Sequence, residues 1–372
     1  MNRTLHRALL ATGLLLALGA SARPAIEGIV EEADTSATTV PFDRTGVVWQ
    51  HELETAPEST FFRLHFKAIA ASADSDFIVR IRDRDDTAVL EVPAPTFSKT
   101  GDYWTPYLQG TYALIQIENR RAAPGTRLSF QLPELGVESH GAQLLNIQDP
   151  LHPKDRNVAA YADNTGLTVA ARGVAKLRFE KNQLLLSCTG FLVSEDLLLT
   201  NQHCLDNTAD CASAVALFGY EEDRDRNLQT GEPFPCEKIE ATDAGLDFTL
   251  LRLGGAPGTK YGVLHWDFAP LHKGAALYII EHPGGRPKRV ALDGCAVKTP
   301  NAPGEIAGQV TDLGHTCDTE DGSSGSPVLN LQNRVVALHH LGFSTNDARW
   351  SRENRAVRAE LVHARIAAFL PP

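Results

Sequence analysis

Apolar and polar residues alternate along much of this 372-residue chain, a pattern typical of β-strands with one buried face. In the run FFRLHFKA, the residues Phe62, Leu64 and Phe66 face one way and the polar residues between them face the other. Further alternating runs, DFIVRIR, TYALIQIEN and TRLSFQL, are separated by Asp, Pro and Gly turns. From residue 61 to about residue 132 we therefore expect an antiparallel β-sandwich or jelly-roll-like fold. Its His and Asp residues are scattered, and we expect them on solvated strand faces.

The alternation stops between Pro133 and about Gly166, where prolines, asparagines and charged residues indicate a connecting segment. We place the boundary near Leu151. It separates an N-terminal β-rich domain with its linker, residues 23–150, from a second domain, residues 151–372. The second domain contains more short strand patterns, among them QLLLSCTGFLV, DFTLLRL and VVALHH. Many short strands joined by Gly and Pro turns predict a sandwich or barrels.

Helical periodicity is clearest at the end of the chain. Between Ala356 and Leu370, apolar residues recur at the spacing of one helix face: Val357, Leu361, Val362, Ile366 and Phe369. We expect this helix to pack its apolar face against the sheets. The predicted fold class is therefore all-β with a C-terminal helix.

The first residues have the pattern of an export signal. Arg3 and Arg7 precede an apolar run over residues 8–18, and the small residues Ala20 to Ala22 follow it. The run is shorter than the roughly 20 residues that span a bilayer, so a signal peptide over residues 1–22 is expected and a membrane anchor is not. We predict a protein that is secreted or periplasmic.

Charge and cysteine content narrow the function. A net charge of -11 and a pI of about 5.6 argue against nucleic-acid binding, which depends on clustered Lys and Arg. All six cysteines lie beyond the predicted boundary. In an exported protein an even number of cysteines predicts disulfides. No pair has the close spacing of a zinc site, so no metal is implied, and nothing in the sequence implies an organic cofactor.

Three residues of the second domain have the chemistry of nucleophilic catalysis. A serine hydroxyl becomes a good nucleophile when an imidazole takes its proton and a carboxylate orients that imidazole. His203 ends the segment LLLTNQH, Asp247 begins the strand pattern DFTLLRL, and Ser324 lies in the glycine-rich turn EDGSSGSPVLN. We predict that these three residues form a catalytic triad.

The segments CTGFLVSEDLLLTNQHC and GSSGSP, in this order with the Asp247 segment between them, resemble the motifs of chymotrypsin-fold (trypsin-like) serine proteases. The resemblance implies a double β-barrel over residues 151–372 and peptide-bond hydrolysis. It makes His203 the general base, Asp247 the residue that orients it, and Ser324 the nucleophile. The backbone N–H groups of Gly322 and Ser324 would form the oxyanion hole.

The resemblance also implies one disulfide, between Cys188 and Cys204. Several connectivities remain open for the other cysteines. From their positions we expect two further bonds, which join Cys211 to Cys236 and Cys295 to Cys317.

The neighbourhood of the nucleophile is closest to that of the bacterial glutamyl and lysyl endopeptidases. Ser323 replaces the aspartate that pairs with a freed N-terminus in trypsin-like members. Glutamyl endopeptidases carry a Thr five residues before the nucleophile and a His fifteen after it, which are Thr319 and His339 here. Lysyl endopeptidases carry a His sixteen residues after it, which is His340. These three residues are the candidate substrate-binding residues.

Nearby charge is the remaining guide to specificity. In the last loop the basic residues outnumber the acidic ones: there are three arginines, Arg349, Arg352 and Arg355, and two acidic residues, Asp347 and Glu353. This balance favours polypeptide cleavage after Glu or Asp, whereas Asp318 favours the alternative, cleavage after Lys or Arg. A further alternative is a catalytically silent binding protein with the protease fold. The sequence leaves open whether the N-terminal domain is a propeptide or a retained module.

Overall fold

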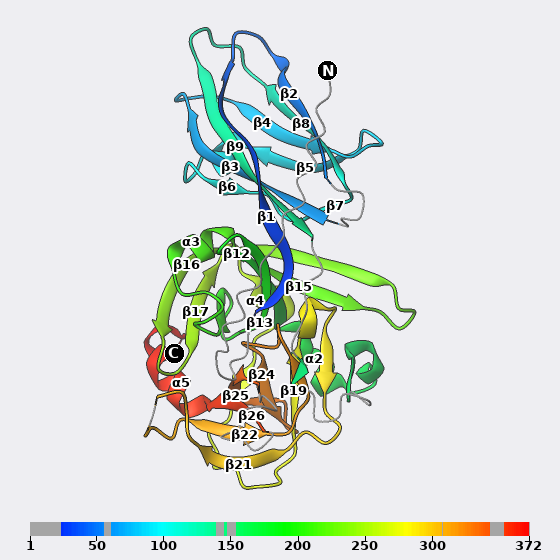
Figure 1. Ribbon diagram of the computed structural model, residues 1–372, viewed down its shortest axis with the longest axis vertical. Helices are drawn as coiled ribbons and strands as arrows, with labels where there is room; N and C mark the ends of the chain where they lie inside the picture. The colour runs from blue at the N-terminus through cyan, green and yellow to red at the C-terminus, as the bar shows by residue number, and fades with distance from the viewer. Residues whose placement is uncertain are drawn as a thin grey trace, which may run out of the picture.

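The protein is described by a computed structural model, in which two β-rich bodies lie one above the other, with strand β1 (Ala25–Pro41) running between them (Figure 1). The predicted signal peptide and the predicted boundary near Leu151 lie outside the described residues. The structure describes residues 24–55, 61–138, 145–146, 154–306, 308–342 and 353–371.

The upper body consists of two sheets that share one core. The first sheet continues from β1 through β9 and β3 to the short strands β6 and β7. The second sheet has the order β2-β8-β4-β5, and the short helix α1 follows β5. Phe62, Phe66 and Phe130 from the first sheet pack with Ile115 and Val79 from the second. The bounds are β2 Gly46–Glu54, β3 Phe61–Ala71, β4 Phe77–Arg82, β5 Ala88–Pro93, α1 Ala94–Phe97, β6 Tyr103–Trp104, β7 Leu108–Gln109, β8 Tyr112–Asn119 and β9 Arg127–Glu138.

The polar face of β3 is buried, which differs from our expectation of solvated polar residues. Arg63 and His65 are 1% and 5% exposed. Arg63 Nε donates to Thr105 O at 2.8 Å, and Arg63 Nη1 donates to Ser213 O, in the lower body, at 2.9 Å. His65 stacks on Trp104. The expectation was wrong for His65, because alternation identifies the two faces of a strand but not which neighbouring groups cover the polar face.

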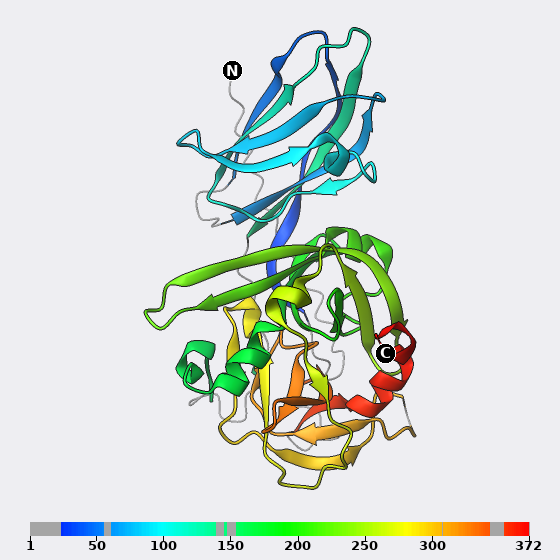
Figure 2. The same ribbon diagram turned by 180° about the vertical axis from the view of Figure 1, so that it is seen from behind.

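The lower body begins with a closed barrel of six strands in the order β12-β15-β16-β17-β14-β13, and β13 pairs back to β12. Leucine and phenylalanine side chains fill its interior, among them Leu177, Leu198, Phe218 and Leu251. Strands β15 and β16 extend beyond the barrel as a long hairpin (Figure 2). The bounds are α2 Thr165–Arg172, β12 Val174–Lys181, β13 Leu184–Leu192, β14 Leu197–Thr200, α3 Thr208–Ser213, β15 Val215–Glu222, β16 Leu228–Asp243, β17 Phe248–Leu253 and α4 Pro257–Tyr261.

A second curled sheet completes the double β-barrel, so the predicted all-β fold class is confirmed. Its order is β11-β20-β19-β24-β25-β26-β22-β21, with β18 beside β25, and the two-stranded pair β10-β23 lies apart from it. A 3₁₀ turn, η1, follows β11, and a second, η2, follows β19. The bounds are β10 Leu145–Asn146, β11 Asp155–Asn157, η1 Val158–Tyr161, β18 His265–Trp266, β19 Leu277–Glu281, η2 Pro283–Gly285, β20 Arg289–Ala291, β21 Val297–Ala302, β22 Asp312–His315, β23 Thr319–Glu320, β24 Pro327–Asn330, β25 Arg334–Leu341 and β26 Asn354–Arg358.

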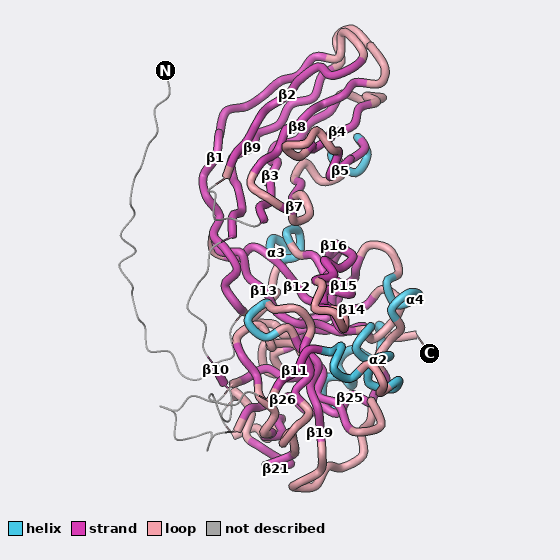
Figure 3. The backbone as a smooth tube through the Cα atoms, turned by 90° about the vertical axis from the view of Figure 1, so that its right-hand side faces the viewer, coloured by secondary structure: helices cyan, strands magenta, loops and turns pink. Residues whose placement is uncertain are grey.

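The C-terminal helix is shorter than predicted. Helix α5 spans Ala359–Ile366, and the 3₁₀ turn η4 spans Ala367–Phe369. Its buried residues include Val362 and Ile366, as expected. Val357, which we placed on the helix, instead belongs to β26 because residues 354–358 pair with β22 and β25. Helices are short throughout (Figure 3), and none in the described part of the chain is long and apolar enough to cross a membrane.

Candidate active site

Two neighbouring strands bring His203 and Asp247 together. Strand β14 ends where β17 begins, because the two strands are antiparallel with Thr200 opposite Thr249. The turn that follows β14 therefore lies beside the residue that precedes β17. His203 Nδ1 lies 2.8 Å from Asp247 Oδ2, and the backbone N–H of His203 donates to Asp247 Oδ1 at 3.0 Å. The carboxylate thus fixes both the imidazole ring and its backbone.

Asp247 is itself held firmly. Its backbone has a φ of 44°, a left-handed conformation that costs about 1–3 kcal/mol outside glycine. Asn201 Nδ2 donates to the Asp247 carbonyl at 2.8 Å and supports that conformation. Burial favours the neutral acid, but the charges of His203 and His340 and their hydrogen bonds lower the pKa of Asp247 below its usual range. The residue is therefore a carboxylate at neutral pH.

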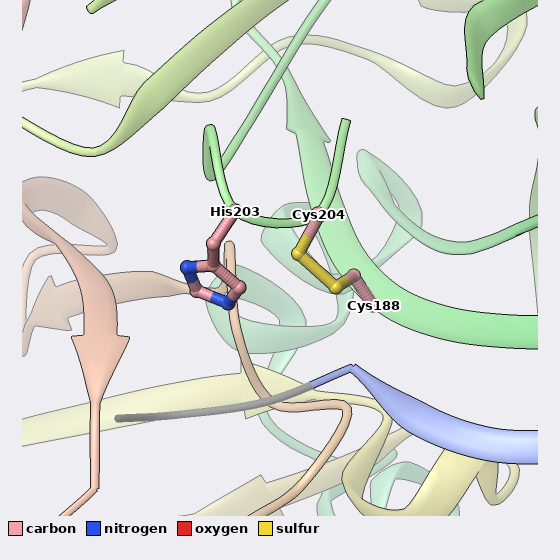
Figure 4. Close-up of side chains that lie close together, drawn as sticks. All are labelled: Cys188, His203 and Cys204. Carbon is pink, nitrogen blue, oxygen red and sulfur yellow. A yellow bond between two sulfur atoms is a disulfide. The ribbon is translucent and has the colours of Figure 1, made fainter. Parts of the chain in front are cut away.

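A disulfide between Cys188 and Cys204 ties the histidine turn to β13 (Figure 4). The two sulfur atoms and the His203 ring lie close together, but the sulfurs are bonded to each other and cannot act as thiolate metal ligands. The other disulfides join Cys211 to Cys236 and Cys295 to Cys317. All three pairs are those expected from the sequence.

Thr189, directly after Cys188, fastens the Ser324 loop to the first barrel. Its N–H donates to Ser324 O at 2.8 Å, and its hydroxyl donates to Gly322 O at 2.9 Å. The same hydroxyl accepts from the backbone N–H of His282 at 2.9 Å. Consecutive residues of β13 therefore position the loop of His203 and the loop of Ser324.

Gly322 and Ser324 lie where an oxyanion hole requires free N–H groups. Within the described residues, neither backbone N–H has a hydrogen-bond acceptor. Gly322 has a φ of 92°, and a Cβ there would lie 2.9 Å from His282 O and 3.1 Å from Ala25 Cβ. Glycine at this position is thus dictated by both conformation and space.

Ser324 Oγ and His203 Nε2 are both buried and have no hydrogen-bond partner among the described residues. The hydrogen bond that the predicted triad would need between these two atoms is therefore not formed here. Such bonds are often long in enzymes without substrate and tighten in the substrate complex. Two unpartnered buried atoms of complementary chemistry are consistent with this behaviour.

His340 lies behind Asp247 rather than facing open solvent. Its Nδ1 is 3.3 Å from Asp247 Oδ2, and its Nε2 is 2.9 Å from Asp312 Oδ2. Burial disfavours the imidazolium, but the charge of Asp312 and the hydrogen bonds of both carboxylates raise the pKa of His340 to about 10. Both ring nitrogens are engaged, so His340 has no ring atom left for a substrate side chain.

His339 and Thr319, the other two candidate substrate residues, are each 1% exposed. The backbone of His339 pairs with the loop of Ser324, because its N–H donates to Ser326 O and its carbonyl accepts from Gly325. Its Nδ1 lies 3.2 Å from His315 Nε2. Burial and nearby imidazoles hold the pKa of His339 well below its usual value. The ring is therefore neutral.

The remaining charges near the loop are partly engaged. Asp318 accepts a hydrogen bond from the backbone N–H of Lys154 at 2.9 Å. Arg355 pairs with Glu353 at 2.7 Å. Arg349, Arg352 and Asp347 lie outside the described residues.

Two residues of this site have no signal in the sequence that we recognised. Thr189 follows the strand alternation and differs from other buried threonines only by its place after Cys188. Asp312 begins β22 and meets His340 only through strand pairing across β26. Both could be found only from the cysteine motif and from the topology of the barrel.

Residues 188–338 match the sequence profile of the trypsin-like peptidase domain. The chain contains a trypsin-like peptidase domain. The matched span includes His203, Asp247 and Ser324.

The chain also resembles parts of two curated proteins. "Secreted RxLR effector protein 73" of Plasmopara viticola is 30% identical over 208 residues, which cover 52% of this chain and 50% of that protein. "Uncharacterized protein y4fB" of Sinorhizobium fredii (strain NBRC 101917 / NGR234) is 32% identical over 199 residues, which cover 49% and 29%. The chain spans half or less of the length of these relatives.

Among solved structures, a Glu endopeptidase in complex with MPD matches with a TM-score of 0.43 and 18% identity. The match covers 60% of this chain and 97% of that one.

A Thr189→Val substitution should impair the nucleophile loop. Valine keeps the shape but leaves Gly322 O and His282 N–H without their buried partner, which costs about 1–3 kcal/mol per group. We expect the labelling rate of Ser324 by a fluorophosphonate to fall about tenfold or more, since small displacements at reacting groups have large effects. Thr230→Val, at an exposed position of β16, is the control. Equal labelling rates for both variants would contradict this role.

A His340→Gln substitution should change the pH dependence of stability. The folded pKa of His340, about 10, lies above the unfolded value near 6.5, so its stabilisation is complete below about pH 6.5 and is lost as pH rises through about 10. At neutral pH the variant should lose about 3–5 kcal/mol. Urea unfolding from pH 6 to 10 should show this difference shrinking, whereas exposed His265→Gln should not. A difference that is constant with pH would exclude the charged His340.

Proposed function

We propose that the protein is an exported serine endopeptidase that uses His203, Asp247 and Ser324. The observation that carries the proposal is the buried His203–Asp247 contact in a trypsin-like peptidase domain. Ser324 and two backbone N–H groups that have no acceptor among the described residues lie on the loop that Thr189 joins to the same barrel. A silent binding scaffold has no physical need for this combination.

In the proposed reaction, Ser324 Oγ attacks the carbonyl carbon of a peptide bond, and His203 Nε2 takes the hydroxyl proton. The N–H groups of Gly322 and Ser324 stabilise the negative charge that develops on the carbonyl oxygen. His203 then gives its proton to the leaving amine, and water hydrolyses the acyl-enzyme. Asp247 remains ionised and stabilises the imidazolium, as its low pKa permits.

Export is supported by two independent features. The basic residues, apolar run and small residues at the start of the sequence have the order of a secretory signal. The three disulfides are typical of proteins in an oxidising compartment. The proposed location is therefore the periplasm or the exterior of the cell.

Active-site labelling tests the enzyme directly. The purified full-length protein should react with a fluorophosphonate, and Ser324→Ala should abolish the labelling. Ser326→Ala, two residues away on the same loop, should retain it. His203→Ala should reduce peptide hydrolysis by about 10³-fold or more. A folded wild-type protein that neither labels nor hydrolyses peptides would instead support the silent binding protein.

We further propose cleavage after Glu or Asp. Thr319 and His339 stand at the positions that bind the acidic side chain in glutamyl endopeptidases. His339 adjoins the nucleophile loop through two backbone bonds, and His315 lies behind it. His340 and Asp318, which would favour a basic side chain, are bound to other groups. A substrate carboxylate beside the neutral His339 would raise its pKa, so binding would take up a proton.

Matched substrates that end in Glu or Gln before the cleaved bond test this specificity. The ratio of kcat/KM for Glu to that for Gln should exceed one and should rise as pH falls from 8 to 6. The ratio removes the pH dependence of the triad, which both substrates share. His339→Gln should flatten it. Faster turnover of Lys or Arg substrates would contradict the proposal and favour the basic alternative.

A further inference from the structure

Strand β1 belongs to both bodies of the protein (Figures 1 and 3). Its first residues, Ala25 to Ile29, pair antiparallel with β13 of the first barrel, opposite Ser187 to Leu184. From Gly28 onward the strand pairs with β9 of the upper body. The sheet of the upper body therefore continues into the barrel without a break. Residues that we assigned from the sequence to the N-terminal domain thus pair with a strand of the peptidase half.

Glu27 carries the only described carboxylate that ion-pairs with Lys176 and Arg178. Its Oε1 pairs with Lys176 Nζ, and its Oε2 lies 2.7 Å from Arg178 Nε. The side chains of all three are at most 8% exposed. Burial raises the pKa of Glu27, but the two cations outweigh burial and hold the pKa below its usual value. Two cations of the barrel wall thus share one carboxylate that belongs to β1.

The upper body also covers Arg178 with aromatic rings. The Arg178 guanidinium lies 4.8 Å from the ring centroid of Phe61 and 4.1 Å from that of Tyr107. Arg63, from β3, donates to Ser213 O in the barrel at 2.9 Å. The contact between the bodies is therefore polar, charged and buried, and its loss would leave barrel cations uncovered.

The contact between the two bodies is connected in two ways to the loop that carries Gly322, called the oxyanion loop below. Lys176 Nζ donates to the carbonyl of Gly285, and the adjacent Gly284 N–H donates to Asp321 O at 2.6 Å, one residue before Gly322. A side chain at Gly285 would collide with the Glu27 carboxylate. Ala25 is fully buried, and its Cβ lies 3.1 Å from the position of a Cβ on Gly322.

We propose that Ala25 to Ile29 are a permanent part of the peptidase, with Glu27 as a positioning residue for the oxyanion loop. This inference rests on the proposed function of the same site. It implies that the N-terminal body is retained in the active enzyme and is not a removable propeptide. In this proposal Glu27 holds Lys176, Lys176 holds the turn at Gly285, and that turn positions the loop of Gly322.

Glu27→Gln is the first test. Burial and Arg178 lower the pKa of Lys176 to about 7 even with Glu27 beside it, so without the carboxylate its amine is neutral at neutral pH and anchors the turn less strongly. We expect kcat to fall about 10- to 100-fold with KM little changed. Affinity for a peptide aldehyde, whose adduct needs the oxyanion hole, should fall by a similar factor, while affinity for the product peptide stays the same.

Glu31→Gln is the matched control, because Glu31 lies on the same strand with an exposed side chain. It should leave all these values unchanged. If Glu27→Gln lowers stability but leaves kcat and the ratio of aldehyde to product affinity at wild-type values, Glu27 is not a positioning residue. Loss of both affinities together would equally contradict a specific effect on the oxyanion hole.

A second test does not depend on a destabilised variant. A recognition sequence for a sequence-specific protease is inserted between residues 139 and 153, and the purified full chain is then cut there. We expect the two fragments to co-elute in size-exclusion chromatography and to label with fluorophosphonate as the uncut protein does. Separation in urea and removal of the N-terminal fragment before refolding should abolish labelling.

Fragments that separate under native conditions while labelling persists or increases would overturn the proposal and establish a removable propeptide. The two proposals fail in distinguishable ways. An uncut wild-type protein that does not label refutes the proposed enzyme. A labelled wild type, with unaffected Glu27→Gln and an active isolated peptidase fragment, refutes only the role of β1.

Discussion

The candidate active site depends above all on the hydrogen bonds of one buried threonine. Thr189 binds the carbonyls of Ser324 and Gly322 and the N–H of His282, and its own carbonyl accepts from Thr200 Oγ1 at 2.8 Å. Because the preceding residue is bridged to Cys204 beside the histidine, a single strand controls the spacing between the two barrels. The serine and the imidazole come from different barrels, and this strand is where their positions are set.

Acidic and imidazole groups alternate around the proposed triad. Asp247 lies between the imidazoles of His203 and His340, and His340 lies between two carboxylates. A buried carboxylate alone would be driven toward its neutral form, and a neutral acid could not stabilise an imidazolium. His203 and, to a smaller extent, His340 therefore keep Asp247 ionised, and Asp312 keeps His340 charged. Neither function can be inferred from the residues of the triad alone.

Strand alternation predicted a sandwich or barrels, and the resemblance of the motifs to trypsin-like proteases implied the double barrel and the Cys188–Cys204 bond. The other two disulfide pairs were expected from the positions of their cysteines. The sequence did not predict the partners of side chains whose contacts depend on how distant segments pack together. His339 and His340 are neighbours on β25, yet one pairs with His315 and the other with Asp312. The turn at His282 lies far from Gly322 in the sequence, and only the fold brings the two together. The buried Arg63 and the position of Ala25 likewise require the second body.

The long reach of β1 also sets an order of assembly. Ribosomes make the N-terminal body first, and its strands β2 to β9 supply most of its core before β13 exists. Until then, the stretch from Ala25 to Ile29 lacks its β13 partner and Glu27 lacks its cations, which leaves an unpaired strand edge of the kind that promotes aggregation. The closing contact joins residues about 150 positions apart, and such distant contacts slow folding. On the proposed role of β1, the loop of Gly322 gains its full support only after both bodies have formed.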